Sequence, residues 1–231
     1  MKTIGLLGGM SWESTLTYYQ AINRAVSERL GQLHSAKIIL NSVDFHEIEQ
    51  LQASGDWHRA GEILASAAKS IEAAGADCIV ICTNTMHKVA EQVTNATSLP
   101  LLHIAEATGR KLKQDGIKKV ALLGTNFTME QDFYKQKLID DFDLSVIIPD
   151  RDQRSVIHSV IYEELCLGKV VSTSKTAYLE IIDSLVAEGA EAVILGCTEI
   201  GLLVNGQDCD IPLYDTTMIH ALAAVDFALS K

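Results

Sequence analysis

The chain has 231 residues, of which 48% are hydrophobic and 21% charged, and its formal net charge is −11 at pH 7. Such a chain can bury the core of one large or two small domains, and its composition is that of a globular rather than a disordered or fibrous protein. The acidic balance argues against a nucleic-acid partner, because duplex binding depends on Lys and Arg that neutralise phosphates. An anionic small molecule remains possible as a ligand, since a few hydrogen-bond donors in a cleft can outweigh the mean surface charge.

The apolar N-terminal segment is interpreted as a buried strand rather than a signal peptide. It is short and rich in glycine, and Trp12-Glu13 stands where a cleavage site would need small residues. No apolar run is long enough to span a bilayer, so no membrane partner is expected. The cysteines are odd in number and show no paired spacing, which favours reduced thiols in a cytoplasmic protein; they are Cys78, Cys82, Cys166, Cys197 and Cys209.

Short β-branched segments alternate with longer amphipathic ones, a pattern typical of an α/β protein with mainly parallel sheets. In chain order we predict a strand at 4–8, a helix from a Ser11 cap to about Leu30, a strand at 37–43, a loop, a helix from Asp56 to about Ala74, and a fully buried strand at 77–82. Helix, strand and helix then follow to Gly116, and a strand at 118–123 begins the series again.

This restart indicates an internal duplication. Residues 74–83 align without a gap with residues 188–197, and residues 4–8 match residues 120–124 at nearly the same offset. The alternative is that any two buried strands after a helix-stopping Gly look alike. We predict two similar Rossmann-like lobes related by a pseudo-twofold, one of residues 1–103 plus 215–231 and one of residues 104–214. A cleft between them would be lined by the carboxyl ends of the strands.

Polar residues stand at the ends of two equivalent strands, Thr83-Asn84-Thr85 in one lobe and Cys197-Thr198-Glu199 in the other. A thiol at a strand end is a candidate proton-transfer group or nucleophile, and its alternative is a small buried hydrophobe. The two hydroxyls and the amide at 83–85 suit a carboxylate, although Thr and Asn are also ordinary helix caps. A pseudo-twofold would place Thr83 and Cys197 on opposite sides of one ligand.

Three motifs resemble the aspartate/glutamate racemase family over essentially the whole chain: Gly-Gly-Met at 8–10, Cys-Thr-Asn-Thr at 82–85 and Gly-Cys-Thr-Glu at 196–199. The resemblance is strongest to bacterial members that act on acidic or a broader range of amino acids. It implies a cofactor-independent racemisation in which two cysteines face each other across the substrate. One removes the α-proton and the other returns a proton on the opposite face. It also implies a small dicarboxylic amino acid as substrate, no cofactor and a homodimer.

The sequence departs from this family at one catalytic position. Thr83 stands where the family has its first cysteine, and the internal repeat aligns Thr83 with Cys197 as well. Cys82 is one residue out of register, which reverses its face, so Cys82 and Cys78 are predicted to lie in the core. A hydroxyl is too weak an acid to supply a base but can donate a proton to a carbanion. The resemblance therefore implies Cys197 as base, Thr83 as proton donor, and kinetically preferred L to D turnover.

Other site residues are expected from their place in the motifs or in the family. The expected substrate-binding residues are Met10, Ser11, Gln52, Asn84, Thr85, Thr125, Lys169, Thr198 and Glu199. Met10 and Ser11 follow a glycine turn whose N–H groups suit a carboxylate, and Thr125 pairs with Thr128 near the α-carboxylate by family position. The loop around Gln52 and the segment ending at Lys169 would reach the distal carboxylate. The alternatives are a tight turn, a helix cap and a solvated lysine.

The seven histidines show no metal spacing, so no metal site is expected. His87 is interpreted either as a residue supporting the Thr83 loop or as a helix-surface histidine. The expected function is racemisation of L-aspartate and L-glutamate. Two alternatives stay open: another enzyme of the superfamily, such as a maleate isomerase or a malonate-type decarboxylase, and a carboxylate-binding protein without catalysis.

Overall fold

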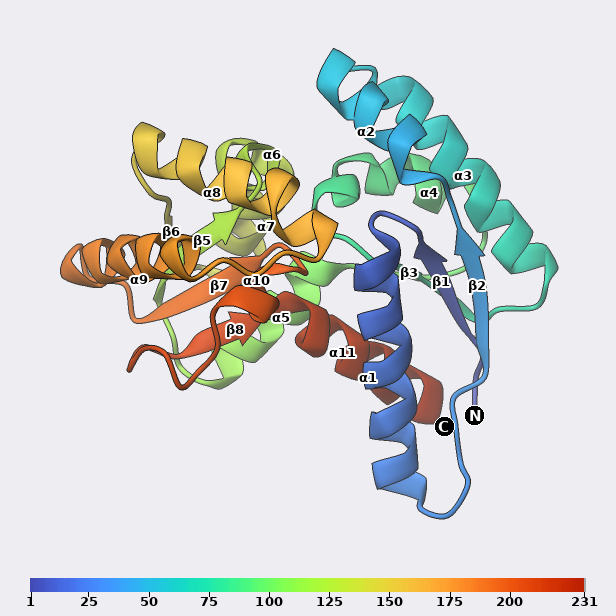
Figure 1. Ribbon diagram of the computed structural model, residues 1–231. Coiled ribbons are helices and arrows are strands. Elements are labelled where there is room, and N and C mark those ends of the chain that lie inside the picture. The colour runs from blue at the N-terminus through green and yellow to red at the C-terminus, as the bar shows by residue number, and fades with distance from the viewer. Residues whose placement is uncertain (231) are drawn as a thin grey trace. The chain divides into compact units, whose positions relative to one another are not determined.

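The computed structural model describes residues 1–230, which divide into two compact units. Unit 1 comprises Met1–Ile104 together with the segment that begins at His220, and unit 2 comprises Ala105–Ile219. Each unit is built on its own four-stranded parallel sheet with helices around it (Figure 1).

The sheet of unit 1 has the strand order β2-β1-β3-β4, and its first strand lies at the centre. The strands are β1 (Ile4–Gly8), β2 (Ile38–Ser42), β3 (Cys78–Ile81) and β4 (Leu101–Leu102). The helices are α1 (Trp12–Leu30), α2 (Phe45–Ser54), α3 (Trp57–Ala73), the 3-10 helix η1 (Thr85–Val89) and α4 (Ala90–Ala96). The C-terminal helix α11 (Thr216–Leu229) begins in unit 2 and continues into unit 1.

Unit 2 repeats this order as β6-β5-β7-β8. Its strands are β5 (Lys119–Gly124), β6 (Ser145–Ile147), β7 (Ala192–Gly196) and β8 (Leu213–Asp215). Its helices are α5 (Ile104–Gln114), α6 (Asn126–Glu130), α7 (Asp132–Phe142), α8 (Arg151–Glu163), the 3-10 helix η2 (Leu165–Leu167), α9 (Ser172–Ala187) and α10 (Ile200–Leu203). The predicted α/β class and the duplication are confirmed, because two separate sheets share one topology.

Strands β1 and β3 of unit 1 are buried on both faces, and alternate residues of β3 belong to two different cores. Cys78, Val80 and Cys82 pack with α1 and α11 in one core. Ile79 and Ile81 pack with α3 in the other. This alternation is the two-residue period of a strand, and it places Cys82 on the face opposite to the one that Thr83 continues. The expected burial of Cys78 and Cys82 is confirmed.

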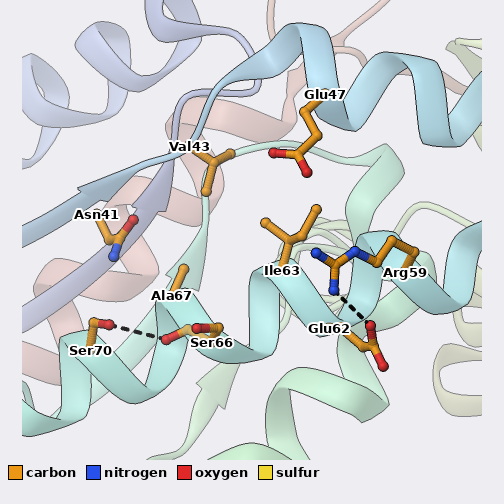
Figure 2. A pocket seen from close by; sticks show the side chains of 9 residues that line it. All are labelled: Asn41, Val43, Glu47, Arg59, Glu62, Ile63, Ser66, Ala67 and Ser70. Carbon is orange, nitrogen blue, oxygen red and sulfur yellow. Dashed lines mark hydrogen bonds and ion pairs between the residues drawn. The ribbon is translucent and has the colours of Figure 1, made fainter.

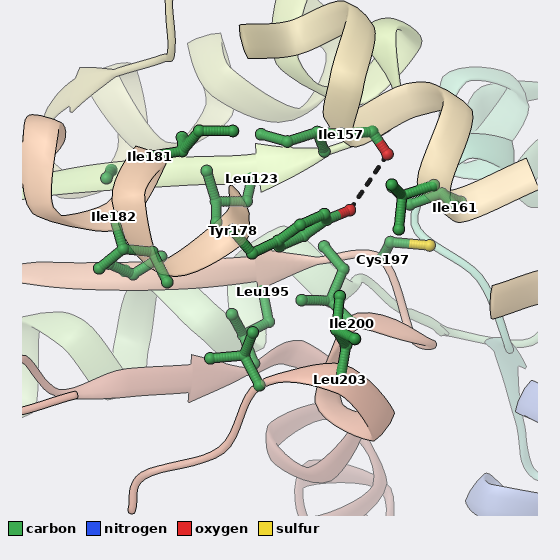
Figure 3. Close-up of a cluster of buried hydrophobic side chains, with 14 of the residues drawn as sticks. Leu123, Ile157, Ile161, Tyr178, Ile181, Ile182, Leu195, Cys197, Ile200 and Leu203 are labelled. Carbon is green, nitrogen blue, oxygen red and sulfur yellow. Dashed lines mark hydrogen bonds between the residues drawn. The ribbon is translucent and has the colours of Figure 1, made fainter. Parts of the chain in front are cut away.

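In unit 2 the matching face of the sheet carries a core that includes Val193, Leu195 and Cys197. Tyr178 of α9 fills its centre and donates a hydrogen bond from its hydroxyl to the Ile157 carbonyl at 3.1 Å. Figure 3 shows Cys197 at the end of this cluster, beside Ile161. Cys197 therefore ends a core-facing row of strand residues, as the repeat predicts for its partner Thr83.

One predicted element was wrong. The segment before Asp56 was expected to be a loop, yet Phe45–Ser54 forms helix α2. The Asp44 side chain caps this helix by accepting from the His46 N–H, and Gly55 ends it in a left-handed conformation. The helix is mostly polar, with few apolar positions, and this hides its period in the sequence. Gln52 consequently lies on a helix and not in a loop.

The equivalent glycines that end α3 and α9 show how closely the two units correspond. Gly75 has φ of +93° and Gly189 has φ of +92°, values that favour glycine because it lacks a Cβ. Within residues 1–230, no helix has the length and apolar character needed to cross a membrane.

Candidate active site

In unit 1 the predicted site begins directly after β3. Thr83 is 9% exposed, and Asn84 and Thr85 are buried as well. The chain then turns into η1 rather than into a regular α-helix, and Asn84 makes no side-chain cap to it. Thr83 continues the face of β3 that carries Ile79 and Ile81. These three polar residues therefore form a buried strand end.

The glycine turn before α1 lies against the same strand end. Ser11 caps α1 by accepting a hydrogen bond from the Ser14 N–H at 3.3 Å, as predicted, and Ser14 donates from Oγ to the Cys82 carbonyl at 3.0 Å. Gly9 has φ of +91°, and a Cβ there would lie 2.2 Å from the Val43 carbonyl oxygen. Only glycine fits this turn, which holds Met10 and Ser11 in buried positions.

Gln52 is brought to the same end of unit 1 by α2. Its side chain is buried, and its Nε2 donates to the Met86 sulfur at 3.0 Å. Met86 is the third residue after Thr83, so Gln52 packs against the segment that follows the strand end. The structure thus groups Gln52 with the Thr83 segment, although its secondary structure was mispredicted.

His87 also belongs to this group, and the expectation of a helix-surface histidine was wrong. Its side chain is buried and lies inside unit 1. Nδ1 lies 2.8 Å from the Thr83 carbonyl oxygen, and Nε2 lies 3.2 Å from the Ile104 N–H. Burial, reinforced by His103 and His220, holds the pKa of His87 well below its usual value, so the imidazole is neutral.

In unit 2 the equivalent strand end is built around a thiol and a carboxylate. Cys197 is 9% exposed, and its Sγ donates to Glu199 Oε2 at 3.0 Å. Thr198 Oγ1 donates to the same oxygen at 2.6 Å. Glu199 is buried, so a single carboxylate oxygen receives both donors away from bulk water.

These surroundings keep Cys197 protonated in the resting protein. Burial is the main cause of a pKa well above the usual thiol value, and the Glu199 carboxylate raises the pKa further. A nearby acceptor that holds the thiol proton is the arrangement expected of a thiol that is deprotonated only when it reacts.

A hydroxyl pair lies next to this strand end. Thr125 follows β5 and caps α6 by accepting from the Thr128 N–H at 3.3 Å. A Cβ on Gly196 would meet the Thr128 methyl group at 3.4 Å, so the pair packs beside the residue that precedes Cys197. The helix cap considered as the alternative role for Thr125 is therefore present, and a binding role would have to coexist with it.

Lys169 lies in the segment after η2 and is exposed. Its backbone N–H donates to the Glu164 carbonyl at 2.9 Å, which closes the end of α8. Cys166 of the same segment packs against the core that contains Cys197. The segment is thus adjacent to that core, while Lys169 itself is exposed.

An open cavity of about 390 Å³ lies elsewhere in unit 1, between β2, α2 and α3 (Figure 2). It is lined by Asn41, Val43, Glu47, Arg59, Glu62, Ile63, Ser66, Ala67 and Ser70. Arg59 Nη1 donates to Glu62 Oε2 at 3.0 Å within α3, and Glu47 faces them from α2 (Figure 2). None of the predicted site residues lines this cavity.

Two features of the site were underestimated from the sequence. The burial of His87 depends on packing against His103, Ile104 and His220, which the local pattern does not report. The spacing of two residues between Cys197 and Glu199 after a strand suggested that their side chains could be in contact. Whether the thiol and the carboxylate do form a hydrogen bond depends on the direction in which the chain turns after β7. Among residues 1–230, no three His, Cys, Asp or Glu side chains are grouped as metal ligands.

Comparisons with known proteins agree with the motifs. A sequence model of the Asp/Glu/hydantoin racemase family matches residues 7–224. The broad-specificity amino-acid racemase RacX of Bacillus subtilis is 25% identical over 237 aligned residues, which cover 98% of each chain.

Solved structures extend the comparison to the fold. A Yersinia pestis protein proposed to be an Asp/Glu racemase is 57% identical, with full coverage of both chains and a TM-score of 0.93. An aspartate racemase homologue from Pyrococcus horikoshii is 33% identical, also with full coverage of both chains and a TM-score of 0.87.

Proposed function

Because the chain belongs to the Asp/Glu/hydantoin racemase family and is an amino-acid racemase by that membership, we propose that it racemises L-aspartate and L-glutamate without a cofactor. Cys197 is the base and Thr83 the proton donor, and both act on the substrate α-carbon. The observation that carries the proposal is the Cys197–Glu199 hydrogen bond of 3.0 Å at one strand end, matched by a buried hydroxyl at the equivalent strand end.

Glu199 is the acceptor of the Cys197 thiol proton. Transfer from Cys197 Sγ to Glu199 Oε2 produces a thiolate and a neutral carboxylic acid, and Thr198 already donates to that oxygen. The thiolate then removes the α-proton of the L-isomer and becomes a thiol again. The pair has then gained one proton, which neutralises the Glu199 carboxylate and offsets the negative charge that develops on the α-carbon, and this suits a site with little water.

Thr83 completes the reaction on the other face. A carbanion next to a carboxylate is a stronger base than an alkoxide, so proton transfer from Thr83 Oγ1 to the α-carbon is favourable. The resulting alkoxide takes a proton from water, and Glu199 returns its proton to solvent. In the reverse direction Thr83 would have to start as an alkoxide, so the turnover of D-isomers is slow. The equilibrium constant between enantiomers stays at unity.

The carboxylate-binding residues are proposed from the same two strand ends. Met10, Ser11, Asn84 and Thr85 offer N–H groups and hydroxyls beside Thr83, and Thr198 with Thr125 does so beside Cys197. Gln52 contacts the Thr83 segment through Met86 and is proposed for the distal carboxylate. Lys169 is proposed for the same carboxylate, supported by its exposed ammonium and the packing of Cys166 against the Cys197 core.

Solvent deuterium tests the proposal. The native chain should wash deuterium into the α-position of L-aspartate or L-glutamate and yield the deuterated D-isomer, as followed by NMR and chiral chromatography. A maleate isomerase or a decarboxylase would leave the amino acids unchanged. A binding protein would raise the melting temperature with either amino acid and exchange no α-proton. Absence of exchange with both amino acids rejects the proposal.

A further inference from the structure

His87 links the peptide that carries Thr83 to another part of unit 1. Nδ1 lies 2.8 Å from the Thr83 carbonyl oxygen, and Nε2 accepts a hydrogen bond from the Ile104 N–H at 3.2 Å. A carbonyl can only accept and an amide N–H can only donate, so the proton is on Nδ1 and Nε2 is bare. A second proton on the ring would point at the Ile104 N–H. The geometry therefore requires a neutral ring in one tautomer.

A second imidazole, that of His220, contacts the same segment. His220 Nε2 donates to the Leu102 carbonyl at 2.6 Å, and His220 Nδ1 accepts from the Tyr18 hydroxyl at 2.8 Å. The residues from Leu102 to Ile104 are thus fixed by one ring at the carbonyl and by another at the amide. Both rings use both nitrogens in these bonds, which leaves neither as a metal ligand.

This segment is where the chain leaves unit 1, since Ile104 is its last residue before unit 2. His220 is the residue at which the chain returns. The hydrogen bonds of His87 therefore connect the Thr83 peptide to a fixed point at the boundary of its own unit. The Thr83 peptide has an anchor outside its own turn.

Unit 2 has no histidine at the position equivalent to His87, although its backbone follows the same topology. The repeat that aligns Thr83 with Cys197 aligns His87 with Gly201. A Cβ on Gly201 would lie 3.1 Å from Asp215 Oδ2, so the carboxylate of the residue that ends β8 lies against this position. In unit 1 the His103 ring lies against His87, with centroids 4.5 Å apart. The aligned position is thus an imidazole in unit 1 and a glycine in unit 2.

We propose that His87 is a positioning residue for Thr83: its Nδ1–H holds the Thr83 carbonyl and thereby aims the Thr83 hydroxyl at the face of the α-carbon opposite to Cys197. The inference rests on the proposed function of Thr83 as the proton donor. A hydroxyl that has to donate once, without a charge to draw it to the carbanion, depends on its orientation more than a thiolate does. Rotation of the Thr83 peptide would leave proton removal by Cys197 intact and impair proton return.

The quantity to measure is the fraction of the carbanion that is reprotonated to the D-isomer rather than to the L-isomer. In D₂O, Cys197 gives deuterated L-substrate once its thiol has exchanged the abstracted proton for solvent deuterium, and Thr83, whose hydroxyl is already deuterated, gives deuterated D-product. The ratio of the two products at early times does not depend on how much of a variant is folded. A purely structural role for His87 would lower both products together and leave the ratio unchanged.

Two substitutions separate the two nitrogens of His87. In His87→Asn the side-chain amide N–H can stand where Nδ1–H stands, so the bond to Thr83 is kept. In His87→Gln the side-chain carbonyl can stand where Nε2 stands, so only the bond to Ile104 is kept. We expect the ratio of D- to L-product to fall only about threefold in His87→Asn, which loses the anchor at Ile104, and at least about tenfold in His87→Gln, which loses the bond to Thr83, as misoriented groups react far more slowly.

Tyr134→Phe is the matched control. It removes a buried hydrogen bond to Thr108 that shares no residue with the His87 and His220 contacts, so it should lower the melting temperature and leave the ratio unchanged. A native ratio in His87→Gln, or equal losses in both His87 variants, overturns the inference while the proposed function stands. A native chain without any α-exchange overturns both.

Imidazole ¹⁵N NMR of the native chain provides a measurement that needs no variant. It should find the His87 proton on Nδ1, and the opposite tautomer would overturn the inference.

Discussion

The two strand ends of the molecule share a backbone plan and differ in chemistry. Thr83 and Cys197 follow equivalent strands, continue equivalent core-facing rows and are equally buried at 9% exposure. The thiol has a carboxylate to take its proton at 3.0 Å. The hydroxyl has its peptide carbonyl held by an imidazole at 2.8 Å. The contacts of Cys197 are thus suited to proton transfer, and those of Thr83 are suited to fixing the orientation of its peptide.

This difference shows how duplicated units can diverge without a change of fold. A buried parallel sheet fixes the register of every strand residue and the face to which its side chain points. A substitution at a strand end therefore changes the functional group of the side chain and keeps the position of the backbone. We expect the asymmetry to appear in rates, because no catalyst changes the equilibrium between enantiomers.

The largest expected effect comes from removing the thiol. Cys197→Ser should lower α-deuterium incorporation from L-aspartate or L-glutamate about 10³-fold, since a positioned acid or base contributes about 10²–10⁴-fold. Cys82→Ala is the matched control, because Cys82 is fully buried on the other face. It should lower the melting temperature and keep the exchange rate. Equal losses in the two variants would contradict the assignment of Cys197.

Restoring the symmetry of the two ends should have the next largest effect. Thr83→Cys replaces a hydroxyl by a group that can become a base, so deuterium exchange into D-isomers should rise about 10²-fold. The measurement is the initial rate from the D-isomer compared with that from the L-isomer. A D-isomer rate in the native chain that already equals the L-isomer rate would remove the comparison on which this prediction stands.

Glu199→Gln tests the carboxylate separately from the thiol. Because the carboxylate raises the pKa of Cys197, its removal should lower the thiol pKa toward its ordinary value. Alkylation of Cys197 at a fixed pH near neutrality should become faster, since more thiolate is present. L to D turnover should nevertheless fall by at least about tenfold, because the proton acceptor is gone. If alkylation slows, or if turnover is kept, Glu199 does not have this role.

The smallest effect concerns the shared backbone plan. Gly75→Ala and Gly189→Ala place a Cβ on residues with φ of +93° and +92°. Each should reduce the free energy of unfolding of its own unit by about 1 kcal/mol. Gly206→Ala is the control, because open space surrounds Gly206 and its φ is not positive. Urea unfolding measures all three, and clearly unequal costs at 75 and 189 would show that the units are less alike than their topology.

Much of the fold was predictable because its signals are local. The buried strands at 4–8 and 77–82, the cap at Ser11 and the glycine stops follow from short-range patterns, and the repeat followed from comparing the chain with itself. Helix α2 was missed because its surface is mostly polar, although Asp44 and Gly55 were available as cap and stop signals. Gln52 was therefore expected in a loop, whereas it lies on this helix and contacts Met86.

The sequence by itself determined the duplicated α/β plan, the two strand ends and the substitution of a hydroxyl for a thiol at 83, because periodicity and register are properties of neighbouring residues. Only the tertiary structure decided that His87 is buried between the Thr83 carbonyl and the Ile104 amide, and that the Glu199 carboxylate turns back to Cys197. Such contacts depend on how a turn is aimed and on which distant element packs beside it, and neither is encoded in the spacing of residues along one segment.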